Sequence, residues 1–323
     1  MSAATWASPS SSSGSLSSSF GVHVPSGLRH FEGRFQNLRG QSLFYFSLYP
    51  PSKRTLRGVV LYPMARVITA AEGFGVISYD MVNHGASDCD GHKTRGHVRS
   101  FRQLVEDTDT YVAFAKNAIF PQTSLLMPPL IIAGTSFGSL VALHVVLSGQ
   151  HKFYAGFWAG PTVGMEMSTP WKVQVAFIQP LALLLPRVRL VPGVDYELLW
   201  RDPGTLEDFK ADVLATKSDI TARTMQQTLS AMHRLTKDKS IKQAGSGFCA
   251  ISVLFLVGSE DHIADQGVTR KFHDKFANMD KQFKVFDGVF HSVFEDPKRD
   301  LVFAFLCQWL RDRFPELHTD KTS

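Results

Sequence analysis

Hydrophobic residues along this chain gather in short blocks that polar segments separate. Compact apolar runs at 58–62, 74–79, 130–133, 153–158, 251–257 and 283–286 predict buried strands. Apolar residues at helical spacing predict amphipathic helices over 99–118 and 301–314, a core-facing helix over 140–147 and a short helix over 64–72. Two further strands, 31–37 and 41–49, precede them around a turn. Strands that alternate with helices predict an α/β fold with a mostly parallel central sheet and helices on both faces.

Two segments depart from this pattern, one before the first predicted strand and one after residue 160. Residues 1–28 are rich in serine, and the first 27 contain no Lys, Arg, Asp or Glu, so we expect a disordered tail. After residue 160 the chain has helical periodicity and several prolines but no obvious sheet strand until residue 251. We therefore expect core segments at 29–160 and 246–318, with a helical cap inserted at 161–245.

The cap contains a strongly apolar stretch at 171–191, in which Pro180 and Pro186 are expected to break the helix. One interpretation is a pair of helices packed on the core. The other is a lid whose apolar face guides a greasy substrate or touches a membrane.

Composition narrows the class of protein. The formal net charge of +5 over 323 residues is mild, and the one basic cluster, at 233–242, is typical of a solvated helix end, so no nucleic-acid partner is expected. No apolar run is long enough to span a bilayer. We expect a cytoplasmic protein with peripheral membrane contact through the cap. Its three cysteines are far apart in the sequence and predicted to be reduced: Cys89, Cys249 and Cys307.

The segment around Ser136 carries the strongest chemical signal. Gly134-Thr135-Ser136-Phe137-Gly138 is a G-x-S-x-G between a predicted strand and a predicted helix. This pattern places a serine on a sharp turn, where only small neighbours fit, and exposes its hydroxyl at the top of the sheet. The backbone N–H of Phe137 would then lie at a helix N-terminus and face a developing oxyanion. The alternative is an ordinary glycine-rich turn between a strand and a helix.

A serine hydroxyl needs a base, and an imidazole base needs an acid that holds its tautomer. Asp261 follows the strand at 251–257, and His291 follows the strand at 283–286. Because the carboxyl ends of parallel strands share one edge, both lie on the rim that carries Ser136. The alternative makes Asp261 a helix cap and His291 a loop residue. Asp265 and His262 are the nearest rivals, although neither is as well placed after its strand.

The loop at 80–96 is polar and rich in groups that can bind metals. Their spacing fits no zinc pattern, so we expect a loop that lines a cleft, with neither metal nor cofactor. The groups, with one just beyond the loop, are His84, Asp88, Cys89, Asp90, His92 and His97.

From about residue 32 to 314 the chain resembles the monoacylglycerol lipase and lysophospholipase branch of the α/β-hydrolases, also called serine aminopeptidase-like hydrolases. The resemblance implies a Ser136–Asp261–His291 triad, a helical cap over the cleft, no cofactor and hydrolysis of long-chain acyl esters. It rests on the serine motif and on these segments: Gly33-Arg34-Phe35, Gly40-Gln41-Ser42-Leu43, Gly73-Phe74-Gly75-Val76, Tyr79-Asp80, Asn83-His84-Gly85-Ala86-Ser87-Asp88, Gly258-Ser259-Glu260-Asp261 and Phe290-His291.

One part of the family pattern is missing. The family has His-Gly-x-Gly after its third strand, which supplies a second oxyanion N–H. Here Tyr62 runs directly into Pro63, which has no N–H to donate. Too few residues separate Tyr62 from Phe74 for this segment to hold both an oxyanion loop and a full helix. The backbone N–H of Met64 or of Ala65 is a candidate for a substitute donor, and we expect Met64.

The leading hypothesis is a serine ester hydrolase that acts on lipid-like esters of the monoacylglycerol or lysophospholipid type. The alternative is a catalytically impaired relative that binds lipid or a partner and has lost its oxyanion loop. An aminopeptidase is a third interpretation, disfavoured because the greasy cap suits acyl chains better than charged peptide N-termini.

Overall fold

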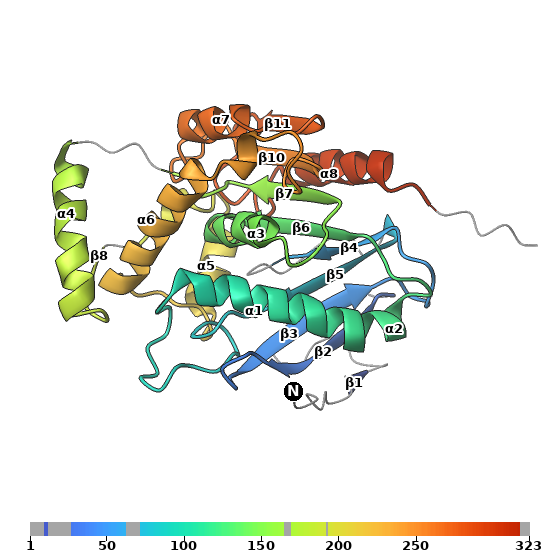
Figure 1. The fold of residues 1–323 in the computed structure, drawn as a ribbon, viewed down its shortest axis with the longest axis horizontal. Coiled ribbons are helices and arrows are strands. Elements are labelled where there is room, and N and C mark those ends of the chain that lie inside the picture. The colour runs from blue at the N-terminus through green and yellow to red at the C-terminus, as the bar shows by residue number, and fades with distance from the viewer. Residues whose placement is uncertain (1–9, 12–26, 63–71, 165–168, 192, 317–323) are drawn as a thin grey trace, which may run out of the picture.

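The structure is a computed structural model, and it describes residues 10–11, 27–62, 72–164, 169–191 and 193–316. Its centre is a nine-stranded sheet in the order β1-β2-β3-β5-β4-β6-β7-β10-β11 (Figure 1). The strands are β1 (Ser10–Ser11), β2 (Arg29–Gln36), β3 (Ser42–Tyr49), β4 (Gly58–Leu61), β5 (Phe74–Tyr79), β6 (Leu130–Thr135), β7 (Ala155–Ala159), β10 (Ser252–Gly258) and β11 (Lys281–Phe286). The eight predicted strands are present, and each end lies within two residues of its prediction.

The sheet is mostly parallel, as the sequence predicts. β1, β2 and β3 pair antiparallel, and β3 joins β5 antiparallel. From β5 through β4, β6, β7 and β10 to β11 every pairing is parallel. The carboxyl ends of these six strands therefore share one edge, which is where ligands bind in sheets of this kind.

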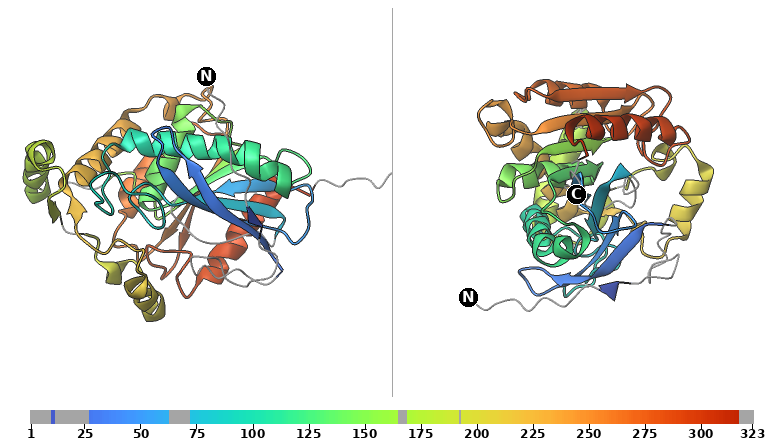
Figure 2. Two further views of the ribbon diagram at one scale, coloured as in Figure 1. Left: turned by 90° about the horizontal axis from the view of Figure 1, so that it is seen from below. Right: turned by 90° about the vertical axis from the view of Figure 1, so that its right-hand side faces the viewer.

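Helices pack on both faces of the sheet (Figures 1 and 2). α1 (Phe101–Phe114), α3 (Phe137–Ser148) and α7 (Gln266–Asp274) share one hydrophobic cluster with one face of the strands. α8 (Arg299–Arg313) shares a second cluster with the opposite face. In β6 the pleat divides the side chains accordingly, because Ile132 belongs to the first cluster and Ile131 to the second.

The predicted helix at 99–118 ends in an unexpected way. α1 continues into a π-helical turn, η2 (Ala115–Ile119), and then into α2 (Phe120–Thr123). The predicted helix at 64–72 falls almost entirely in 63–71, outside the described residues. Of the predicted tail at 1–28, Ser10 and Ser11 pair with β2, and residues 1–9 and 12–26 lie outside the described part.

The segment between β7 and β10 is largely helical. It contains α4 (Thr169–Leu184), η3 (Tyr196–Leu198), α5 (Pro203–Ala211), α6 (Ala222–Lys237) and η4 (Ser240–Lys242). It also contains a small antiparallel sheet of β8 (Arg189–Val191) and β9 (Ile220–Thr221), a pairing too short to leave a strand pattern in the sequence. The division into tail, core and cap remains a prediction.

Pro180 does not break the helix, which corrects the expectation from sequence. It lies inside α4, which ends only at Leu184, before Pro186. A proline removes one backbone donor, and the ladder resumes after it, because the Leu185 N–H donates to the Leu181 carbonyl at 2.8 Å. Within the described parts of the chain, no helix has the length and apolar character needed to cross a bilayer.

Candidate active site

The turn around Ser136 joins β6 to α3. Ser136 has φ +49° and ψ −125°, a backbone conformation that non-glycine residues rarely adopt. A Cβ on Gly134 would lie 2.6 Å from the Ser139 nitrogen, so this position accepts only glycine. The Ser139 hydroxyl closes the turn by donating to the Gly134 carbonyl at 2.7 Å. The strand, sharp turn and helix predicted from G-x-S-x-G are present.

Asp261 and His291 form a buried pair at the carboxyl ends of β10 and β11. The His291 Nδ1 lies 2.9 Å and 3.0 Å from the two carboxylate oxygens of Asp261. Their side chains are 1% and 0% exposed. The Asp261 carboxylate also accepts from the backbone N–H groups of Ile263 and Ala264 at 2.9 and 2.8 Å. Asp261 therefore holds its own loop and the imidazole together.

The rival residues have other partners. Asp265 caps the N-terminus of α7 by accepting from the Val268 N–H at 2.8 Å. His262 is about half exposed and lies beside Glu260. The structure thus brings together Asp261 and His291 and leaves both rivals out.

The second ring nitrogen of His291 is buried and has no hydrogen-bond partner. With Nδ1–H donated to a carboxylate, Nε2 carries the free lone pair, so the imidazole has the tautomer that a general base requires. A buried polar atom without a partner carries a desolvation cost, and a role as a general base would account for it at this position.

Ser136 and His291 both adjoin the segment that follows β7. The Ser136 N–H donates to the Ala159 carbonyl at 3.0 Å, and the Thr162 N–H donates to the Ser136 carbonyl at 3.3 Å. A Cβ on Gly160 would lie 2.9 Å from the His291 Nδ1. The Ser136 hydroxyl is 3.4 Å from the Thr162 hydroxyl, and no hydrogen bond joins it to His291 in the described structure. Catalytic hydrogen bonds are often long or open before substrate binds.

Of the two oxyanion donors predicted from the sequence, Phe137 and Met64, only Phe137 lies in the described part of the chain. Phe137 is the first residue of α3, where backbone N–H groups have no partner inside the helix. Met64 lies in 63–71, outside the described residues. Tyr62, just before that segment, is buried, and its hydroxyl hydrogen-bonds with that of Thr135.

Sequence reasoning missed two carboxylates that follow His291. Burial raises the pKa of Glu295 to about 7, against the opposing effect of His291. Asp296 has a fully buried side chain that accepts from Arg201 at 2.7 Å and from the Phe290 N–H at 3.2 Å. Glu295 and Asp296 lie four and five positions after His291, and this short spacing was visible in the sequence.

The potential metal-binding side chains in and just after the loop at 80–96 do not gather at one site. Asp88 accepts from the Ser42 N–H at 2.8 Å, while the His97 Nδ1 lies 3.0 Å from the Thr221 hydroxyl. Among the described residues no group of three or more His, Cys, Asp or Glu side chains is arranged to hold a metal ion.

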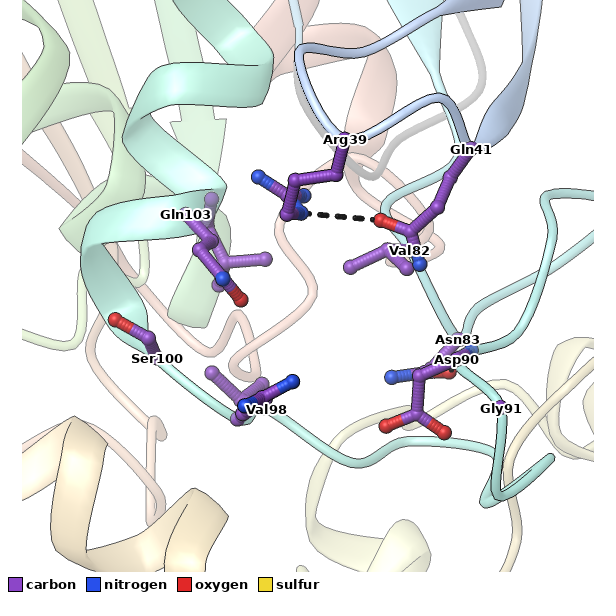
Figure 3. A pocket seen from close by; sticks show the side chains of 11 residues that line it. Arg39, Gln41, Val82, Asn83, Asp90, Gly91, Val98, Ser100 and Gln103 are labelled. Carbon is purple, nitrogen blue, oxygen red and sulfur yellow. Dashed lines mark hydrogen bonds between the residues drawn. The ribbon is translucent and has the colours of Figure 1, made fainter.

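The loop lines a cavity of about 240 Å³ against the β2–β3 turn and the first turn of α1, and no triad residue borders it (Figure 3). Arg39 crosses toward Gln41, whose amide oxygen accepts from the Arg39 Nε at 3.1 Å. Other residues that line it are Val82, Asn83, Asp90, Gly91, Val98, Arg99, Ser100, Gln103 and Leu104.

A comparison of the sequence with known protein families identifies the family of this chain. The sequence matches the family described as Serine aminopeptidase, S33 (Hydrolase_4), over residues 66–298, which is more than half of the chain. The chain belongs to this family. The S33 assignment confirms the resemblance inferred from sequence motifs.

Curated relatives of this S33 protein are lipases. Over 74% of this chain it is 27% identical to a monoacylglycerol lipase from Mycolicibacterium smegmatis, of which it covers 79%. It is 21% identical to phospholipase YtpA from Bacillus subtilis over 74% of this chain and 87% of that protein. The protein is therefore a hydrolase-family member of the lipase and esterase type.

Solved structures show the α/β-hydrolase fold. A soluble variant of monoglyceride lipase from Saccharomyces cerevisiae, in complex with a substrate analog, has a TM-score of 0.71 and 19% identity, covering 88% of this chain and 95% of that one. A monoacylglycerol lipase from Paleococcus ferrophilus has a TM-score of 0.66 and 22% identity, covering 84% of this chain and 99% of that one.

Proposed function

We propose that this S33 protein is a serine ester hydrolase that cleaves carboxylic esters of lipid-like substrates, of the monoacylglycerol or lysophospholipid type. The observation that carries the proposal is the buried Asp261–His291 pair with a free Nε2, on the same sheet edge as the strained turn of Ser136. Ser136, His291 and Asp261 are the proposed nucleophile, base and orienting acid.

The proposed reaction has two steps. The Ser136 Oγ attacks the acyl carbon while the His291 Nε2 takes its proton, and the imidazolium then gives that proton to the leaving alcohol as the C–O bond breaks. Water attacks the resulting acyl-enzyme by the same route, and the acid is released with Ser136 restored. Asp261 stays ionised and stabilises the imidazolium.

The Phe137 N–H would hold the negative charge that develops on the carbonyl oxygen. Losing one of two oxyanion donors costs on the order of 3 kcal/mol, or at least about a hundredfold in rate. Pro63 supplies no N–H after Tyr62, and the Met64 amide is the proposed substitute. Because this amide stands in for a dedicated oxyanion loop, we expect it to recover only part of that stabilisation and the enzyme to be slow.

Apolar side chains at the end of α4 favour a lipid-like substrate. Phe177, Leu183, Leu184 and Leu185 are 68%, 73%, 76% and 54% exposed. Such side chains suit the headgroup and acyl boundary of a bilayer, so the proposal includes peripheral membrane contact through the cap. It also includes a cytoplasmic location, in keeping with three cysteines that are predicted to be reduced.

A turnover assay tests the proposal. Purified protein is given a long-chain monoacylglycerol, the matching lysophosphatidylcholine, a p-nitrophenyl ester and an aminoacyl amide, with Ser136→Ala as control. Ester cleavage that Ser136→Ala abolishes, with no cleavage of the amide, supports the proposal. Cleavage of the amide alone, or ester cleavage unchanged in Ser136→Ala, contradicts it.

The missing N–H at Pro63 favours a second candidate, a catalytically impaired relative that binds acyl ligands. It predicts that oleic acid raises the melting temperature while none of the four substrates is turned over. Turnover that depends on Ser136 rejects this candidate.

A further inference from the structure

A group of four arginines lies where the cap meets the loop at 80–96. We call it the arginine cluster, and it consists of Arg95, Arg187, Arg189 and Arg223. Three of its members come from the cap. Arg187 and Arg189 lie just after α4, and Arg223 lies in the first turn of α6. The fourth, Arg95, belongs to the loop.

Backbone hydrogen bonds bring the cap arginines together. The Arg223 N–H donates to the Pro186 carbonyl at 3.1 Å, and the Ala222 N–H donates to the Val188 carbonyl at 2.9 Å. These bonds flank Arg187 on both sides, so Arg187 and Arg223 are neighbours. Arg189 pairs in register with Thr221 between β8 and β9.

The loop arginine is fastened to the same place. The Arg189 guanidinium donates to the backbone carbonyls of Arg95 and Asp219. Arg95 in turn donates to the Gly85 carbonyl at 2.8 Å. Nearby, burial lowers the pKa of His97, the positive charges of Arg187, Arg223 and Arg189 lower it further, and the Asp90 carboxylate opposes them.

The cluster carries more positive charge than its partners neutralise. Its hydrogen bonds go to backbone carbonyls and to the amide oxygen of Gln226. In the part of the chain that is described, no carboxylate forms an ion pair with any of the four. Asp219, the acidic residue beside Arg189, uses its carboxylate to accept from the Gly193 N–H. The Arg187 Nε is buried and has no hydrogen-bond partner.

Neighbouring arginines that form no ion pair with a described carboxylate suit a phosphate group, which guanidinium groups bind through paired charge-assisted hydrogen bonds. The chain next to them indicates where that phosphate comes from. The exposed Leu183, Leu184 and Leu185 end one residue before Pro186-Arg187. α4 and β8 lie together at the left edge of Figure 1, outside the layers of the core. Apolar side chains beside cations fit the boundary between acyl chains and headgroups.

We propose that the arginine cluster binds the phosphate groups of anionic phospholipids, so that the cap docks on negatively charged lipid surfaces. This inference rests on the cap contact in the proposed function and names its lipid class, but it does not depend on catalysis. Ser136→Ala therefore binds vesicles as the wild type does, even if the triad assignment fails.

Vesicle sedimentation with the full chain tests the proposal. Vesicles of phosphatidylcholine alone are compared with vesicles that contain a third phosphatidylserine, at low and high salt. We expect tighter binding to the anionic vesicles, and we expect salt to remove the difference. Arg187→Gln with Arg223→Gln lowers the partition coefficient on anionic vesicles by about 30-fold and leaves binding to phosphatidylcholine unchanged. If this pair does not fold, Arg187→Gln alone is used, with about fivefold expected.

The matched control is Arg102→Gln with Lys275→Gln, which removes the same charge from exposed positions on α1 and after α7. The control pair keeps wild-type binding if the proposal is right. Equal binding to both kinds of vesicle, or equal losses in the two pairs, overturns it. Inorganic phosphate that raises the melting temperature of the wild type, but not of the Arg187→Gln, Arg223→Gln pair, without lowering vesicle binding also overturns it, because the site then takes free phosphate.

Discussion

Gly160 adjoins both halves of the candidate site, since it follows the carbonyl that holds Ser136 and touches the ring of His291. It has φ +47°, and a Cβ there would lie 2.8 Å from the His291 carbonyl oxygen and 2.9 Å from its Nδ1. We expect Gly160→Ala to lower the free energy of unfolding by about 2–4 kcal/mol and to lower kcat at least about tenfold, by strain and by displacement of the imidazole.

Gly149 offers a matched control for that prediction. It has φ +67° at the C-terminus of α3, but a Cβ there would meet no described atom within 4 Å. Gly149→Ala therefore suffers only the backbone strain, about 1 kcal/mol, and keeps wild-type kcat. Chemical denaturation and ester turnover measure both variants. Equal losses of kcat in the two would show that Gly160 has no special relation to His291.

The raised pKa of Glu295 predicts that the stability of the protein depends on pH. Its pKa is raised from 4.5 to about 7, so the folded protein binds more protons than the unfolded chain between these values. Stability from this site is therefore lost as pH rises through that window. Glu295→Gln removes the loss, and its advantage over the wild type should grow by about 2 kcal/mol from pH 4.5 to 7 and then level off. Denaturation at several pH values measures this. An advantage that is constant with pH would contradict it.

At the residue scale, the sequence identified those candidate site residues that a short local pattern marks. Asp261 and His291 each follow a strand, and Ser136 lies within a short motif. Gly160, Thr162 and Arg201 gave no such signal, because their importance comes from segments that only the folded chain brings together.

At the scale of elements, the segment between β7 and β10 is linked to the loop after His291 at two points. The Ser292 N–H donates to the Leu199 carbonyl at 3.1 Å, and Arg201 pairs with the buried Asp296. Arg201→Met leaves the Asp296 carboxylate buried without its cation, so we expect the free energy of unfolding to fall by about 3 kcal/mol. Lys210→Met breaks the exposed pair with Glu207 and should cost less than about 0.5 kcal/mol. Similar losses in both variants would contradict the role of burial.

The crossover after β4 gives a prediction about rate. Inserting His-Gly-Ser-Gly after Tyr62 supplies the loop donor that the Met64 amide is proposed to replace only in part, so kcat/KM on a p-nitrophenyl ester should rise, by up to about a hundredfold. The same insertion combined with Ser136→Ala should give no activity. An insertion variant that folds and keeps the wild-type rate would show that the second donor is already present.

Most elements were predictable because strands and amphipathic helices leave periodic patterns. The exceptions have physical reasons. Pro180 removes only one donor from α4, so the helix continues through it. β8 and β9 contain three and two residues, too few for a pattern of alternation. The π-helical turn at Ala115–Ile119 contains five residues, too few to leave a periodic pattern of its own.

At the scale of the whole molecule, the parallel sheet explains how residues far apart in the sequence come to one edge. β6, β10 and β11 end on the same side, so the groups that follow them meet there. The alternation of elements predicted a mostly parallel sheet, and the expectation of one shared edge followed from it. A hydrogen bond between Ser136 and His291 did not follow from the sequence, because it depends on side-chain geometry that strand ends do not fix.

Covalent labelling of Ser136 tests the central claim most directly. The folded protein is treated with a fluorophosphonate, and the modified peptide is identified by mass spectrometry. The account predicts modification at Ser136 that is lost on heat denaturation and falls at least about a hundredfold in rate in His291→Ala. Folded protein whose Ser136 stays unmodified, while a monoacylglycerol lipase in the same tube is labelled, would contradict it.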